Sequence, residues 1–89
     1  MALGEFKVTC YVLPGVTRSG QPVSEAVVAV DPDVIPLGTS VWIEGVGVRT
    51  ALDTGPAVQG NVVDVWWPDV PTCEARQGGT RLGEVWRLP

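Results

Sequence analysis

The chain has 89 residues, of which 45% are hydrophobic and 18% charged, and ten acidic against six basic side chains give a net charge of −4. These values fit one globular domain over residues 1–89. No Lys/Arg cluster exists to bind nucleic acid, and no apolar stretch is long enough to cross a membrane. Histidine is absent, so acid–base chemistry must come from carboxylates, and no metal or cofactor is expected.

Apolar residues alternate with polar ones instead of recurring at helical spacing, which predicts short strands. Six strands are expected, over residues 6–13, 26–30, 39–44, 46–52, 61–67 and 80–88. The second is continuously apolar, as in a strand buried on both faces, and the third and fourth should pair about Gly45. A loop over 14–22 and a helical turn at 74–77 separate the others. Six short strands with long loops predict a closed all-β barrel.

Three aspartates, Asp31, Asp53 and Asp64, each follow apolar residues. Asp31 and Asp53 stand at strand ends, where Asp-Pro and Asp-Thr-Gly are also ordinary turn openings. Asp64 lies within a strand, on the same face as Val62 and Trp66. Its apolar neighbours should desolvate the carboxyl group and raise its pKa, which is the environment of a general acid. The alternative for Asp64, a solvated outer face, stays open.

The tripeptide Asp53–Gly55 also occurs in aspartic proteases, where one copy per chain would require a homodimer that brings two carboxylates together. However, no glycine-rich flap hairpin follows this tripeptide. The apolar-apolar-Gly segment that would support such a site is also missing, because Asp64 occupies the glycine position. A homodimeric aspartic protease is therefore the third hypothesis for function.

A series of short motifs resembles the 3D domain family, which is named for its three aspartates. These motifs are Thr9 and Tyr11, Thr17–Gly20, Ala29–Pro32, Ile35–Thr39, Gly45 and Gly47, Ala51–Gly55, Gly60, and Asp64–Trp66. The family is similar to the catalytic domain of MltA-type lytic transglycosylases and of stationary-phase survival proteins of Gram-positive bacteria. The resemblance covers nearly the whole chain. It implies a six-stranded double-psi β-barrel and peptidoglycan as the substrate.

The resemblance also implies roles for individual residues. Asp64 would be the general acid, Asp53 would support it, and Asp31 would complete an acidic cluster. The residues expected to bind substrate are Tyr11, Thr39, Gly55, Gly60 and Trp66. Gly55 and Gly60 are further expected to form turns with positive φ. Pro56 stands where the family usually has a second glycine, which stiffens this loop and bears on glycan preference.

The leading hypothesis is a lytic transglycosylase that cleaves the β-1,4 bond from N-acetylmuramic acid to N-acetylglucosamine and forms a 1,6-anhydro sugar. The expected partners are peptidoglycan glycan strands, met by a monomer outside the cytoplasm at the cell wall. Because residues 1–5 do not form a signal peptide, the chain is expected to be cytoplasmic, exported by another route, or cut from a larger protein. A phage lysin and a domain of a secreted wall enzyme both fit. The second hypothesis is a non-catalytic wall-binding module.

Two further features leave alternatives open. The large rings could stack on sugars or fill the core; Trp66 is the best candidate for a groove, Trp67 must face the opposite way, and Trp86 is expected in the core. Cys10 and Cys73 could form a disulfide, which extracytoplasmic work would permit, or remain free buried thiols.

Overall fold

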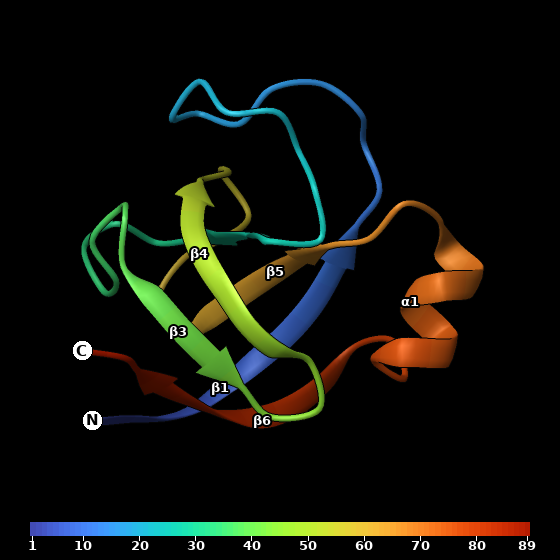
Figure 1. Cartoon of the computed structure of the whole chain (residues 1–89). Coiled ribbons are helices and arrows are strands. Elements are labelled where there is room, and N and C mark those ends of the chain that lie inside the picture. The colour runs from blue at the N-terminus through green and yellow to red at the C-terminus, as the bar shows by residue number, and fades with distance from the viewer.

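The computed structural model describes residues 1–89 and shows a closed six-stranded barrel with one short helix (Figure 1). The elements are β1 (Ala2–Tyr11), β2 (Val27–Val30), β3 (Ser40–Ile43), β4 (Gly47–Asp53), β5 (Val62–Trp66), α1 (Val70–Arg76) and β6 (Arg81–Arg87). Around the barrel the strand order is β1-β5-β2-β4-β3-β6, and β6 closes on β1. The β1/β5 and β2/β4 pairs are parallel and the other four are antiparallel. The predicted closed barrel of six strands is confirmed.

Most predicted strand bounds agree with the structure to within one residue, but β1 and α1 differ. β1 begins at Ala2 because the first residues pair with β6, with a register shift between Ala2 and Gly4. α1 begins at Val70, four residues before the predicted helical turn. Its N-terminus is capped by Asp69, whose carboxylate accepts a hydrogen bond from the Thr72 amide at 2.7 Å.

The core fills the barrel with small β-branched side chains and a few larger ones. All four residues of β2 are buried, as the continuous apolar run predicts. Trp67 also lies in the core. The charged side chain of Arg49 is also buried. Arg49 donates hydrogen bonds to the carbonyls of Val27 and Trp66, and its guanidinium lies 4.6 Å from the Trp67 ring centre. Burial lowers the pKa of Arg49 to about 10.

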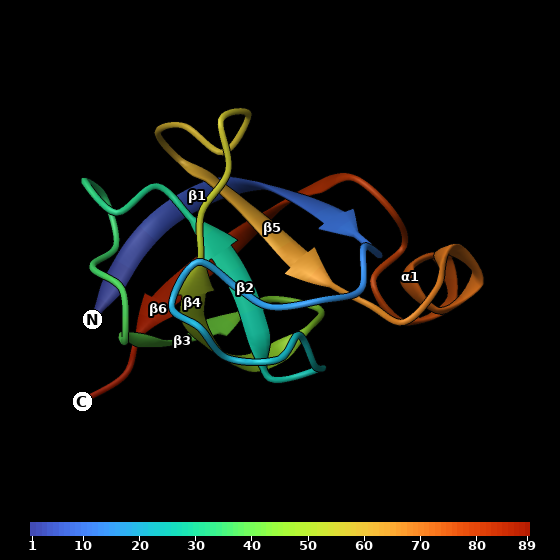
Figure 2. The same ribbon diagram turned by 90° about the horizontal axis from the view of Figure 1, so that it is seen from above.

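A disulfide and one glutamine fasten α1 to the carboxyl end of β1. Cys10 and Cys73 are bonded to each other, so the chain has no free thiol. Gln77 accepts a hydrogen bond from the Trp67 indole and donates to the carbonyls of Thr9 and Gly79. Figure 2 shows α1 at one side of the barrel and the β4–β5 loop projecting from it. The helix is too short and too polar to span a membrane.

The expectation that Trp86 lies in the core is wrong. Its side chain is 45% exposed, because Gly83 and Val85 are the residues of β6 that face inward. Leu82 and Trp86 both point outward from this strand, so a prediction from apolar character alone places the wrong face of β6 against the core. Both chain ends lie beside this strand, where the Met1 amino group donates to the Arg87 carbonyl (Figures 1 and 2).

Candidate functional site

Strand register places two of the three candidate catalytic residues, Asp53 and Asp64, in one row on the outside of the barrel. Thr9 of β1 is opposite Asp64 of β5, Asp64 is opposite Ala29 of β2, and Ala29 is opposite Asp53 of β4. Alternation along β5 turns the neighbours of Asp64 into the core and leaves Asp64 half-buried on the outer face. It shares that face with Val62 and Trp66, as predicted. Because Ala29 has only a methyl group, the floor between the two carboxyl groups stays open.

Three donors converge on the carboxylate of Asp53. The Tyr11 hydroxyl donates to Oδ2 at 2.9 Å, and the backbone amides of Arg18 and Thr54 donate to Oδ1 at 2.8 and 3.0 Å. Burial and the hydrogen bond to Asp53 both raise the pKa of Tyr11, so its hydroxyl keeps its proton and remains a donor. Hydrogen bonds of this kind favour the negative charge of a carboxylate.

Asp64 has the opposite environment. Burial is the main cause that raises its pKa, and the nearby negative charge of Asp53 raises it further. Its one hydrogen bond comes from the Thr9 hydroxyl, which donates to Oδ1 at 2.7 Å and by itself lowers the pKa. The net shift is upward. Asp64 therefore holds its proton to higher pH than an ordinary aspartate, as a general acid must.

Both carboxyl groups open into a hollow of about 320 Å³, which we call the Asp64 hollow. It is lined by Tyr11, Leu13, Ala29 and residues 53–58 together with Asp64. A second hollow of about 590 Å³, the Arg18 hollow, is lined by residues 16–18 and shares the segment 53–56 with the first. A long substrate laid across this segment would occupy both hollows, with Asp53 between them.

Asp31 and Gly60 lie outside these hollows and contact each other. The Gly60 amide donates to Asp31 Oδ2 at 2.8 Å, and the Asp33 amide donates to Oδ1 at 3.0 Å. These two hydrogen bonds lower the pKa of Asp31. Gly60 has φ +68°, as predicted for a turn. Asp31 thus fastens the β4–β5 loop to the end of β2, and its catalytic role remains a prediction.

Three other predicted substrate-binding residues have different positions. Gly55 lines both hollows, but its φ is not positive, which corrects the expectation of such a turn there; an added Cβ would lie 3.4 Å from Val58. Thr39 lines a separate hollow near the chain's C-terminus. Trp66 is not among the lining residues. Its indole N–H donates to the Leu13 carbonyl at 2.9 Å, which fixes Leu13 at the edge of the Asp64 hollow.

Three contributors to the site were not predicted: the Thr9 hydroxyl, the backbone amide and side chain of Arg18, and the Thr54 amide. Thr9 and Arg18 stand within the motifs that carried the family resemblance, but a motif alone does not show which carboxylate a residue contacts. That contact depends on the parallel pairing of β1 with β5. No group of three or more potential metal ligands comes together in the structure.

Comparison with known proteins gives matches in sequence and in structure. Residues 26–89 match the model of the 3D domain family. The cell wall-binding protein YocH of Bacillus subtilis is 48% identical over 60 residues, which cover 63% of this chain and 21% of YocH. The putative cell wall shaping protein YabE of the same organism is 49% identical over 55 residues, which cover 62% of this chain and 13% of YabE. The chain therefore spans about a fifth or less of these relatives.

The barrel superposes on the crystal structure of MltA from E. coli, a lytic transglycosylase, with a TM-score of 0.71 and 28% sequence identity. The match covers 86% of this chain and 28% of MltA. A structure of MltA with bound chitohexaose matches with a TM-score of 0.68. With these matches, the predicted double-psi β-barrel is confirmed.

Proposed function

The chain belongs to the 3D domain family, and on this premise we propose that it is a lytic transglycosylase acting on peptidoglycan glycan strands. The observation that carries the proposal is the pair of carboxyl groups in the Asp64 hollow, one desolvated and one held by three donors. When the surroundings of two neighbouring carboxyl groups differ in this way, the desolvated group suits the role of a general acid and the hydrogen-bonded group that of a fixed negative charge.

In the proposed reaction, Asp64 donates its proton to the oxygen that links N-acetylmuramic acid to N-acetylglucosamine, and the bond from that oxygen to C1 of the muramoyl sugar breaks. The resulting Asp64 carboxylate then accepts the proton of the C6 hydroxyl of the same sugar while the C6 oxygen bonds to C1. The products are a 1,6-anhydro end and a free N-acetylglucosamine hydroxyl. No water is consumed, and Asp64 recovers its proton.

Asp53 would act through its charge in this mechanism. Its carboxylate favours the protonated form of Asp64 before the reaction and would stabilise positive charge on the sugar as the C1 bond breaks. Tyr11 positions Asp53 by its hydrogen bond to Oδ2. Arg18 supplies the only basic side chain that lines either hollow, and it would suit the carboxylates of the peptide stems.

The place of action we propose is the cell wall, outside the cytoplasm. MltA is a lytic transglycosylase, and YocH and YabE are named for binding and shaping the cell wall. The disulfide between Cys10 and Cys73 supports an oxidising compartment, because such bonds are rare in the cytoplasm. The aspartic protease hypothesis is not carried forward, because the family match includes the Asp-Thr-Gly tripeptide.

A second candidate, a non-catalytic wall-binding module, is favoured by the name of YocH. It would need the hollows but not a carboxyl group with a raised pKa. The two candidates differ in what happens to the polymer, because only the enzyme releases new chain ends.

The test is mass spectrometry of the soluble products released from purified sacculi. The wild type is compared with Asp64→Asn and with Asp33→Asn, an exposed aspartate that lines neither hollow. We expect anhydromuramoyl products from the wild type and from Asp33→Asn, and none from Asp64→Asn. Reducing-end products would instead mean a hydrolase. Products from folded Asp64→Asn would refute the assigned acid, and retention on sacculi without any products would favour the binding module.

A further inference from the structure

A second row of side chains crosses the opposite outer face of the barrel. Val48 of β4 is opposite Trp42 of β3, Trp42 is opposite Trp86 of β6, and Trp86 is opposite Ala2 of β1. Beside the two tryptophans, Val41 and Ile43 of β3 and Val85 of β6 face the core. Trp42 is 38% exposed, Trp86 45% and Val48 59%. We call this row of Val48, Trp42 and Trp86 the tryptophan face.

The tryptophan face points away from the two aspartates. In the closed order β1-β5-β2-β4-β3-β6, the strand opposite β5 is β3 and the strand opposite β2 is β6. The candidate catalytic row is centred on β5 and β2, and the tryptophan face on β3 and β6. Figure 1 places β3 and β6 together at the side of the barrel where the chain ends lie. None of the three residues lines either catalytic hollow.

The indole groups on this face keep their hydrogen-bond donors free. Trp66 donates to the Leu13 carbonyl, and Trp67 donates to Gln77. The indole N–H groups of Trp42 and Trp86 donate no hydrogen bond within the protein, and the two residues are directly opposite each other on adjacent strands. Exposed tryptophan combines an apolar ring with a polar handle, so it favours ligands that have an apolar surface edged by acceptors. A pyranose ring in a β-1,4-linked glycan has this chemistry.

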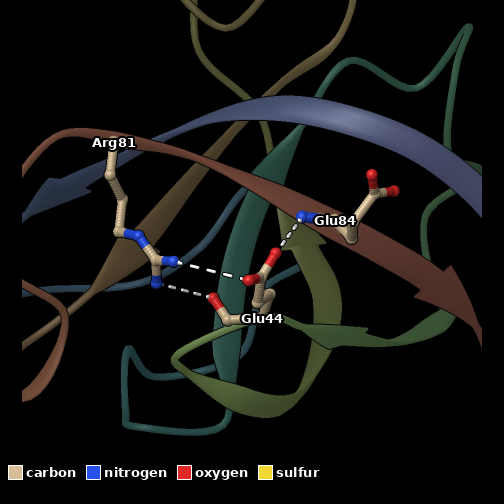
Figure 3. Close-up of polar contacts among 3 residues, drawn as sticks. All are labelled: Glu44, Arg81 and Glu84. Atoms are coloured by element: carbon tan, nitrogen blue, oxygen red, sulfur yellow. Dashed lines mark hydrogen bonds and ion pairs between the residues drawn. The ribbon is translucent and has the colours of Figure 1, made fainter.

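A polar cluster links the β3–β4 turn to β6, and β3 and β6 are the two strands that carry the tryptophan pair. Figure 3 shows its three residues, Glu44, Arg81 and Glu84. Arg81 donates to the Glu44 carbonyl at 3.0 Å and pairs with its carboxylate, which also accepts from the Glu84 amide at 2.9 Å. Gly45 has φ +79°, and a Cβ there would collide with the Arg81 guanidinium, so glycine lets the turn close under this side chain. The β3–β4 turn is thereby fastened to β6, and a preorganised surface loses little entropy on binding.

Two glutamates on adjacent strands lie beside the tryptophan face. Glu84 points outward two residues from Trp86, and Glu5 lies opposite Glu84 on β1. These two carboxylates could accept hydrogen bonds from sugar hydroxyls, and the exposed Arg87 beside Trp86 adds donors at the same face.

The size of the face excludes a stable contact with a second copy of this chain. Two rings that are 38% and 45% exposed offer on the order of 200 Å². A stable protein interface needs about 800 Å² from each partner. An area this small instead matches one or two sugar rings.

We propose that Trp42 and Trp86 form a second glycan-binding site, separate from the catalytic hollows, that holds the domain on neutral stretches of the polysaccharide. This proposal depends on the proposed function for one point only, which is that the bound polymer is a peptidoglycan glycan. Weak binding at such a site raises the effective concentration of the catalytic face along the same or a neighbouring strand, without new contacts at the aspartates.

Nuclear magnetic resonance with chitohexaose tests the site directly. In Asp64→Asn protein, the four indole N–H signals are assigned with Trp42→Phe and Trp86→Phe and followed during titration. We expect the Trp42 and Trp86 signals to shift together at millimolar sugar while the buried Trp67 signal stays fixed. If neither signal moves at saturating sugar, the proposal is refuted, and no loss of folding can explain that result.

Pelleting with sacculi tests the site on the polymer. In the Asp64→Asn background, the Trp42→Ala/Trp86→Ala double variant should bind about tenfold more weakly, whereas Leu82→Ala, an exposed apolar control on β6, should bind as before. Equal pelleting would refute the proposal. So would a tryptophan-dependent dimer in sedimentation. Because pelleting measures binding and not product release, loss of binding in the double variant supports the site even if the proposed catalysis fails.

Discussion

Three aspartates with similar local sequence acquire different chemistry from their partners. Asp31 accepts two backbone amides, and Asp53 accepts two amides and a phenol. Asp64 has one hydroxyl partner, and burial shifts its pKa upward. The mid-strand position of Asp64 made this predictable, because alternation fixes its face and its neighbours. The partners of Asp31 and Asp53 could not be predicted, since they come from loops.

Thr9 should set the upper pH limit of activity. Its hydroxyl stabilises the Asp64 carboxylate and so lowers a pKa that burial raises. Thr9→Val removes that hydrogen bond at nearly constant volume, so the pKa of Asp64 rises further. A general acid works below its pKa, and the alkaline limb of the pH profile should therefore move to higher pH.

The measurement is the rate of anhydromuramoyl release against pH for the wild type, Thr9→Val and Thr9→Ser. Thr9→Ser keeps the hydroxyl and should keep the wild-type limb. A limb that moves to lower pH in Thr9→Val, or that moves equally in both variants, would contradict the role of this hydrogen bond.

At the scale of elements, three consecutive residues at the carboxyl end of β1 connect this strand to three other elements. Thr9 contacts Asp64 of β5, Cys10 is bonded to Cys73 of α1, and Tyr11 contacts Asp53 of β4. The disulfide therefore secures the strand that positions both carboxyl groups. The sequence alone does not decide between this disulfide and two free thiols. Whether Cys73 comes close to β1 depends on where α1 lies after β5, which no local pattern encodes.

Removing the disulfide should destabilise the fold strongly. The bond closes a sequence separation of 63 residues, which is worth ~4 kcal/mol in the chain-entropy model. A small domain has a total stability of about 5–15 kcal/mol, so the loss is a large share of it. Guanidinium unfolding of the wild type with and without reductant measures the effect, and Cys10→Ala/Cys73→Ala should match the reduced protein and ignore the reductant. Identical midpoints in all samples would contradict the prediction.

At the scale of the whole molecule, barrel closure explains which predictions succeeded. Strand number and the faces of β2 and β5 follow from apolar patterns and were predicted. The strand order follows from pairing between distant segments, such as β1 with β5, which no local pattern encodes. A large ring in the last strand favours a core position for Trp86, but β6 turns Gly83 and Val85 inward and leaves Leu82 and Trp86 outside. Because β6 places its large apolar residues outside, Trp86 lies beside Trp42 on the tryptophan face.

The raised pKa of Asp64 should also cost the whole fold stability at neutral pH. Above the ordinary value of 3.8, the unfolded chain releases this proton before the folded protein does, so the folded state binds more protons. Stability from Asp64 is therefore full below that value and is lost as pH rises through the folded-state pKa. Asp64→Asn cannot ionise and escapes this loss, so it should be more stable than the wild type at pH 7 and nearly equal at pH 3.

Urea unfolding at the two pH values measures this difference. Comparison with Asp33→Asn separates the effect of Asp64 from the general loss of one negative charge at an exposed position. If Asp64→Asn were less stable than the wild type at pH 7, the Asp64 carboxylate would be stabilised by the fold, and its role as a protonated acid would lose its physical basis. The expected gain instead means that the fold gives up stability to keep a protonated carboxyl group beside Asp53.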